Sequence, residues 1–148
     1  MKTNRYLTDF YNNYDEDSRL TVKHGSVEFL TTMHYIGKYI KPGDRVLEIG
    51  AGTGRYSHAL ARQSHTVDAV ELIEHNIEVF RRNTLPGENI TVVQGNALDL
   101  SAFEDNTYDI TLLLGPLYHL YSREDKQQAL REAIRVTRPG GVIFAAYV

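Results

Sequence analysis

The segment Val46–Gly54 reads Val-Leu-Glu-Ile-Gly-Ala-Gly-Thr-Gly, an apolar run that ends in three glycines at alternate positions. Such a run is typical of a buried strand, and glycines directly after it permit a tight turn into a helix. They also let the backbone approach a ligand closely, while free N–H groups at the start of the next helix attract negatively polarised groups. The segment therefore predicts a ligand-binding loop at the carboxyl end of a strand.

Short apolar runs alternate with amphipathic segments around this loop. Five runs predict strands, at Arg45–Ile49, Thr66–Val70, Ile90–Val93, Ile110–Leu114 and Val142–Val148. Four segments predict helices, at Ser26–Ile40, Tyr56–Gln63, Glu74–Asn83 and Arg123–Thr137. Residues 97–107 read as loop or a short helical turn. Because nearly continuous apolar strands that alternate with helices form parallel sheets covered on both faces, we expect an α/β fold with a doubly wound, mainly parallel sheet.

The composition is that of one compact domain, with 148 residues of which 42% are hydrophobic. The net charge of -3 argues against a nucleic-acid or anionic-membrane surface. The chain has no cysteine, which excludes disulfides, thiolate metal ligands and thiol nucleophiles. No apolar run near the start predicts a signal peptide or a membrane span. We expect a cytoplasmic protein with an N-terminal arm at 1–23 and a core domain at 24–148.

Three kinds of ligand compete for the glycine loop. A nucleoside triphosphate loop would place Lys and then Ser or Thr after the last glycine, whereas Arg55 and Tyr56 stand there. A dinucleotide loop would place its third glycine at position 55, which is Arg55, so that interpretation is weakened without being excluded. The pattern that remains is Glu-x-Gly-x-Gly-x-Gly, in Glu48–Gly54.

Four further segments follow in order. Glu71 ends the second predicted strand, where a carboxylate can accept hydrogen bonds from ribose hydroxyls. Gln94–Asp99, which reads Gln-Gly-Asn-Ala-Leu-Asp, follows the third strand. Tyr108–Leu120 contains the fourth strand and a Gly-Pro loop with two ring side chains, and Arg138–Gly141 reads Arg-Pro-Gly-Gly before the fifth strand.

From Val46 to Val148, about two thirds of the chain, this ordered set resembles the class I S-adenosylmethionine-dependent methyltransferases of the small-molecule type. The resemblance implies a Rossmann-like fold and S-adenosylmethionine as cofactor, with the glycine loop beneath its methionine part, Glu71 on its ribose and Asn96, where the family usually has Asp, beside its adenine. The cofactor-binding residues it implies are Tyr14, Arg19, Glu48, Gly50, Ala51, Gly52, Thr53, Gly54, Glu71, Leu72, Asn96, Ala97 and Leu114.

A catalytic residue is needed only if the methyl acceptor must lose a proton, because the sulfonium sulfur departs from the methyl carbon as a neutral thioether without help from an acid. His119, with Tyr118 beside it, is the candidate by its place in the Gly-Pro loop. Both rings could instead wall the methyl site or pack beneath the loop. None of the six histidines has a metal-ligand spacing, so no metal site is expected.

The tyrosine-rich arm could fold over the cofactor and exclude water, with Tyr14, Arg19 and His24 as its candidate contacts, or it could be a solvated extension. At the other end, the methyltransferases that the sequence resembles continue with an antiparallel hairpin, whereas this chain stops within the fifth strand. We therefore expect a truncated chain whose fifth-strand edge promotes self-association.

Three functions remain open from the sequence. The leading one is methyl transfer to an unidentified, small-molecule acceptor, with neither nucleic acid nor membrane as a partner. The second is an NAD-linked oxidoreductase. The third is a non-catalytic module that binds S-adenosylmethionine or its demethylated product.

Overall fold

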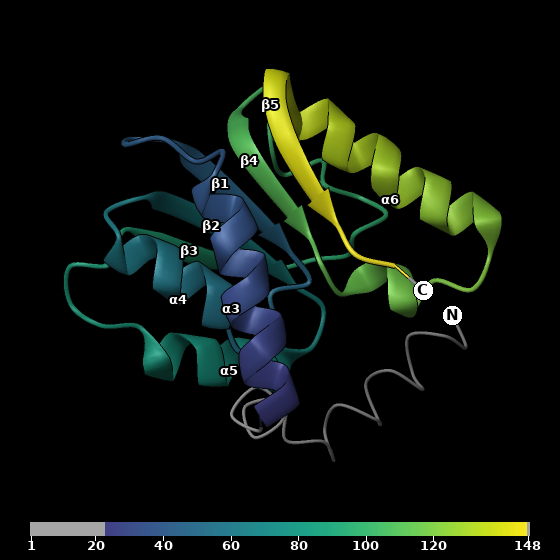
Figure 1. Ribbon diagram of the computed structural model, residues 1–148. Helices are drawn as coiled ribbons and strands as arrows, with labels where there is room; N and C mark the ends of the chain where they lie inside the picture. The colour runs from purple at the N-terminus through teal and green to yellow at the C-terminus, as the bar shows by residue number, and fades with distance from the viewer. Residues whose placement is uncertain (1–22, 148) are drawn as a thin grey trace.

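The computed structural model describes residues 23–147, which form a five-stranded, entirely parallel sheet flanked by helices (Figure 1). The strands are β1 (Arg45–Ile49), β2 (Thr66–Glu71), β3 (Ile90–Gln94), β4 (Tyr108–Leu113) and β5 (Thr137–Ala145). Their order across the sheet is β3-β2-β1-β4-β5. The chain therefore winds outward from β1 to β3 and then returns to the other side of β1. This confirms the doubly wound fold and places a topological switch point between β1 and β4.

Three helices cover one face of the sheet and one covers the other (Figure 1). The first three are α3 (Lys23–Gly37), α4 (Arg55–Arg62) and α5 (Glu74–Asn83), and the fourth is α6 (Arg123–Val136). A short 3-10 turn, η1 (Pro116–Tyr118), which was not predicted, follows β4. The helix boundaries agree with the predicted ones within one residue, except that α3 begins and ends three residues earlier than expected.

The core lies on both faces of the sheet. On the α3 and α4 side, Ile36 and Leu60 pack fully buried against Val46, Val67 and Ile110. On the other side, α6 presents small residues, Ala129 and Ala133, which bring the helix close to the sheet. No helix among residues 23–147 is long and apolar enough to cross a bilayer.

A polar cluster around the buried side chains of Asp68 and Tyr108 joins the strands near their amino-terminal ends. The Asp68 carboxylate on β2 accepts hydrogen bonds from the Tyr108 hydroxyl at 2.7 Å, the Thr91 hydroxyl at 2.6 Å and an Arg45 Nη at 2.9 Å. Burial acts to raise the pKa of Asp68, but these hydrogen bonds outweigh it and lower that pKa. The cluster lies far along the strands from the glycine loop and serves to fix β1, β2, β3 and β4.

The predicted boundaries of the fifth strand were wrong. We expected Arg138–Gly141 to precede a strand at Val142–Val148, but β5 begins at Thr137, directly after α6, and ends at Ala145. Tyr108 pairs with Thr137 and Ile110 with Val142, so the Arg-Pro-Gly-Gly segment forms an irregularity inside the strand. Glycine is needed there, since a Cβ at Gly141 would lie 2.8 Å from the Asp109 carbonyl oxygen.

Candidate cofactor site

The glycine loop lies at the carboxyl end of β1, as predicted. Gly50, Gly52 and Gly54 all have positive φ angles, of 73°, 58° and 89°. Two of them also leave no room for a side chain. A Cβ at Gly50 would lie 2.7 Å from Cγ of Pro116, and one at Gly54 would lie 2.3 Å from the Phe80 ring. Conformation and close packing together explain why this turn requires glycine.

Glu71 lies beside the loop and holds it by hydrogen bonds. Its Oε2 accepts from the Gly52 N–H at 2.7 Å, and its Oε1 accepts from the Ile73 N–H at 2.9 Å and the Asn76 amide at 3.3 Å. The side chain is only 6% exposed, and burial raises its pKa in spite of these donors. The expected neighbourhood of Gly52 and Glu71 is therefore confirmed, since both lie at one edge of the sheet.

Glu48 binds the helix that follows the glycine loop, whereas Glu71 binds the loop itself. Its Oε2 accepts from the Ser57 N–H at 3.0 Å and from the Ser57 hydroxyl. This N–H belongs to the first turn of α4, where the backbone donors have no partner within the helix. Glu48 thus fixes the start of α4, while burial, as the largest cause, raises its pKa to about 8.

The raised pKa of Glu48 predicts a pH dependence of stability. Between the ordinary carboxyl pKa and about 8 the folded chain binds more protons at this site than the unfolded chain, so stability falls as pH rises. Each unit of pKa difference corresponds to about 1.4 kcal/mol. We expect the unfolding free energy to decrease from pH 5.5 to 8, and Glu48→Gln to remove most of that decrease. Urea unfolding at several pH values measures it, and an equal slope in both proteins would contradict the assignment.

The loop after β3 completes this side of the site. Gly95 donates its N–H to the Glu71 carbonyl oxygen at 3.0 Å, which sets the loop beside the end of β2. Asn96 is half-buried, and its Oδ1 accepts from the Leu98 N–H at 3.0 Å. Asp99 is exposed and caps a turn by accepting from the Ser101 N–H at 3.0 Å. Asn96 therefore shapes the loop that borders the site, and Asp99 stabilises its continuation.

The remaining predicted residues lie within the glycine loop or follow β2, β3 and β4. Ala51, Thr53 and Ala97 are buried, and Leu72 is half-buried directly after Glu71. Leu114 follows β4 and packs against the cluster beneath α3 and α4.

The two candidate catalytic rings differ in exposure. Tyr118, in η1, is 43% exposed, whereas His119 at the end of η1 is half-buried. Tyr14 and Arg19 lie outside the described residues, and of His24 only the backbone, as part of α3, is described.

The sequence did not predict the residues that contact the two glutamates and the glycines of the site. Ser57 and Asn76 bind the two glutamates, and Phe80 and Pro116 pack against two glycines. Ser57 and Asn76 lie in the first turns of α4 and α5, so the only available signal was a polar residue near a predicted helix start. Such residues are common at that position, and the signal does not say which carboxylate they face.

The chemistry of this donor set fits S-adenosylmethionine. A buried carboxylate at the end of β2 is an acceptor suited to ribose hydroxyls, and the glycine turn on β1 lacks bulky side chains, so an amino-acid tail can approach its backbone closely. With the tail over β1 and the sugar over β2, the base would lie beyond them, at the loop after β3. The order of the strands therefore gives each part of the cofactor a place along one edge of the sheet.

Comparisons with known proteins agree with this site. Residues 47–145 match the family described as Methyltransferase domain. The chain is 32% identical over 108 residues to a demethylmenaquinone methyltransferase of Staphylococcus aureus, which covers 70% of this chain and 43% of that protein. It thus spans less than half the length of the curated relatives it matches.

Solved structures show the same fold. A Methanosarcina mazei S-adenosylmethionine-dependent methyltransferase has a TM-score of 0.68 at 25% identity, covering 74% of this chain and 54% of its own. A Haemonchus contortus phosphoethanolamine N-methyltransferase in complex with phosphoethanolamine and S-adenosylhomocysteine has a TM-score of 0.77 at 22% identity, covering 96% of this chain and 30% of its own. Family match, fold and site agree: the chain belongs to the S-adenosylmethionine-dependent methyltransferase domain family.

Proposed function

We propose that this chain binds S-adenosylmethionine across the carboxyl ends of β1, β2 and β3 and supports methyl transfer to a small-molecule acceptor held near the end of β4. The observation that carries the proposal is the bond from the Gly52 N–H to the buried Glu71 carboxylate, which joins the two cofactor-binding elements at one edge of the sheet. S-adenosylmethionine, when bound, supplies a methyl group on a sulfonium that leaves as a neutral thioether. The residues of this chain need only orient the reactants, and positioning of this kind supplies most of the rate.

The net charge of -3 favours a small acceptor over nucleic acid. We also propose a cytoplasmic location, since a chain without cysteines does not need an oxidising compartment. The NAD-linked alternative is less well supported. Arg55 stands where that fold needs a third glycine, and its guanidinium lies 4.4 Å from the Phe29 ring.

Calorimetric titration of the chain with S-adenosylmethionine, S-adenosylhomocysteine and NAD tests the cofactor. We expect both sulfur nucleosides to bind and NAD not to bind. An acceptor screen with radiolabelled methyl donor then tests transfer. Absence of binding by both nucleosides would reject the proposal, and binding without transfer to any acceptor would favour a non-catalytic module.

A substitution at His119 tests whether a general base takes part in methyl transfer. If His119 removes a proton from the acceptor, His119→Asn should lower kcat by about 100-fold or more and leave the affinity for S-adenosylhomocysteine unchanged. Tyr118→Phe is the comparison, since it keeps the ring and removes the hydroxyl. Equal kcat values for wild type and the His119 variant would reject His119 as a base and favour the alternative in which both rings line the methyl site.

The outer edge of β5 is proposed to pair with a second copy of this chain. β5 is the last strand of the sheet, and its final residue, Ala145, is exposed. A lysine there would oppose edge pairing. We expect light scattering to show a concentration-dependent dimer that Ala145→Lys abolishes and that Gln127→Lys, an equal charge on exposed α6 surface, retains. A monomer at all concentrations would contradict this expectation.

A further inference from the structure

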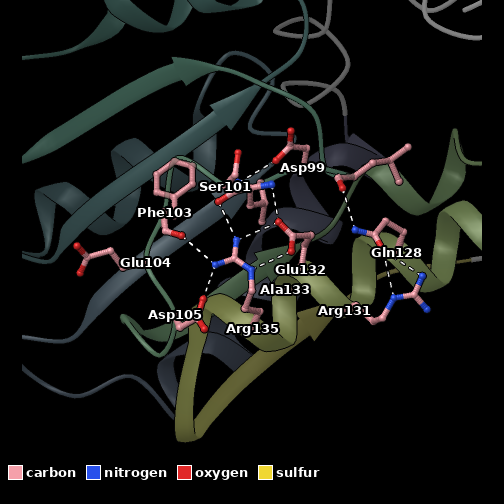
Figure 2. A network of polar contacts seen from close by, with 12 residues as sticks. Asp99, Ser101, Phe103, Glu104, Asp105, Gln128, Arg131, Glu132, Ala133 and Arg135 are labelled. Atoms are coloured by element: carbon pink, nitrogen blue, oxygen red, sulfur yellow. Dashed lines mark hydrogen bonds and ion pairs between the residues drawn. The ribbon is translucent and has the colours of Figure 1, made fainter.

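The connection between β3 and β4 differs from the other crossovers of the sheet. Among residues 23–147, helices α4, α5 and α6 fill the other three connections, whereas the segment 95–107 contains no helix. Its backbone donors and acceptors therefore need partners elsewhere. Many of them lie on α6, which packs beside the segment (Figure 2).

Three side chains of α6 bind this segment along its length. Gln128 donates to the Leu98 carbonyl oxygen at 3.1 Å, and Glu132 accepts from the Leu100 N–H at 2.6 Å. Arg135 donates to the carbonyl oxygens of Leu100 at 2.8 Å and Phe103 at 2.9 Å, and to the Asp105 carboxylate at 2.6 Å. One guanidinium thus joins three points of the segment (Figure 2).

Glu132 holds the guanidinium in place for this task. Arg135 Nε lies 2.8 Å from Oε1 of Glu132, and Arg135 Nη2 lies 3.0 Å from Oε2, which is a two-pronged contact with a planar group. The same Oε2 accepts from the Leu100 N–H. The pair is therefore a single clamp that grips Leu100 at both its N–H and its carbonyl oxygen.

The clamp acts on the same segment that borders the candidate cofactor site. Leu100 is 1% exposed and anchors the segment in the core, and Ala97, three residues earlier, is 8% exposed. Asn96 and Ala97 border the place that the strand order gives to the base of the cofactor. Because Gln128 fixes Leu98 and the clamp fixes Leu100, α6 limits how far Asn96 and Ala97 can move.

We propose that Arg135, held by Glu132, is a positioning residue that sets the nucleoside end of the cofactor cleft. The inference rests on the proposed cofactor binding. Folding has already ordered this loop before the ligand binds, so binding of the nucleoside loses less conformational entropy. Lysine at position 135 would keep the charge but could not reach Glu132 and two carbonyl oxygens at once.

The test compares Arg135→Lys with Arg45→Lys, which weakens an arginine–carboxylate contact between β1 and β2. Affinity for S-adenosylhomocysteine is measured by calorimetry, and amide hydrogen exchange at Ala97 and Leu98 is measured without ligand. We expect Arg135→Lys to weaken binding about tenfold and to speed exchange at both amides by a similar factor. Arg45→Lys should leave both quantities within about twofold of wild type. Glu132→Gln, which removes less, is the second variant if Arg135→Lys does not fold.

Affinity within twofold of wild type for Arg135→Lys would overturn the inference. So would an equal loss in Arg45→Lys, because the effect would then be general destabilisation. If the wild-type chain binds no sulfur nucleoside, the proposed function has failed on its own. Unchanged exchange in Arg135→Lys would then separately overturn the role of Arg135 in fixing the loop.

Discussion

Gly54→Ala is expected to be the most destabilising single-methyl change in the glycine loop. An alanine there would have to adopt a φ of 89°, and its Cβ would lie 2.3 Å from the Phe80 ring. The left-handed conformation costs roughly 1–2 kcal/mol and overpacking adds about 1–3 kcal/mol. The sum is a large share of the roughly 5–15 kcal/mol that stabilises a typical domain. Urea unfolding measures the loss.

Gly43→Ala is the matched control for this prediction. Gly43 has a similar φ of 83°, but a Cβ there would meet nothing within 4 Å. Only the conformational cost remains, so we expect a loss of about 1–2 kcal/mol. The difference between the two variants isolates the contact with Phe80. Equal losses would show that Phe80 moves aside without cost and would refute the steric argument.

Glu71→Gln is expected to weaken the binding of S-adenosylmethionine and S-adenosylhomocysteine by about 30-fold, the equivalent of about 2 kcal/mol. The substitution keeps the shape of the side chain but replaces one acceptor oxygen by an NH₂ group. That group must face either the Gly52 N–H or the Ile73 N–H, which are donors too. The loop is released and the acceptor for the ribose is weakened at the same time.

Glu74→Gln controls for charge in the same segment. Glu74 lies in the first turn of α5, its side chain is 56% exposed and its contact with Arg81 is a loose 4.0 Å. Its neutralisation should leave both affinities within about twofold of wild type. Calorimetric titration of both variants makes the comparison, and a Glu71→Gln protein that binds as tightly as Glu74→Gln would remove Glu71 from the site.

The sequence predicted most of the fold because its local signals agree with one another. Val46–Gly54 and the apolar run before Glu71 each show a strand followed by a turn, and both strands begin where expected. The predicted start of the fifth strand was wrong because Pro139 and two glycines normally mark a turn, whereas here Thr137 joins α6 and β5 directly. Thr137 donates to the Ala133 carbonyl oxygen one helical turn earlier at 2.6 Å, and its hydroxyl also hydrogen-bonds to that of Thr111 on β4 at 2.7 Å. The contact with Thr111 comes from tertiary structure.

The residues of the candidate site could be predicted where a sequence motif contains them. They were missed where only the packing of a helix brings them to the site. Gly52 and Glu71 follow from their positions after neighbouring strands. Ser57, Asn76 and Arg135 could not be found in this way, because the hydrogen bond of each depends on the direction in which a helix packs on the sheet. A spacing in sequence does not give that direction.

The contact of Pro116 with Gly50 gives the two sides of the cleft different sensitivities to solvent. The proline ring occupies the volume that a side chain at position 50 would need, so the turns after β4 and β1 interlock by shape alone. Gly52, two residues later, donates a hydrogen bond to the Glu71 carboxylate, and the strength of this acceptor depends on its protonation. Protonation of Glu71 therefore weakens the acceptor that it offers to the proposed sugar, whereas the fit of Pro116 against Gly50 does not change with pH.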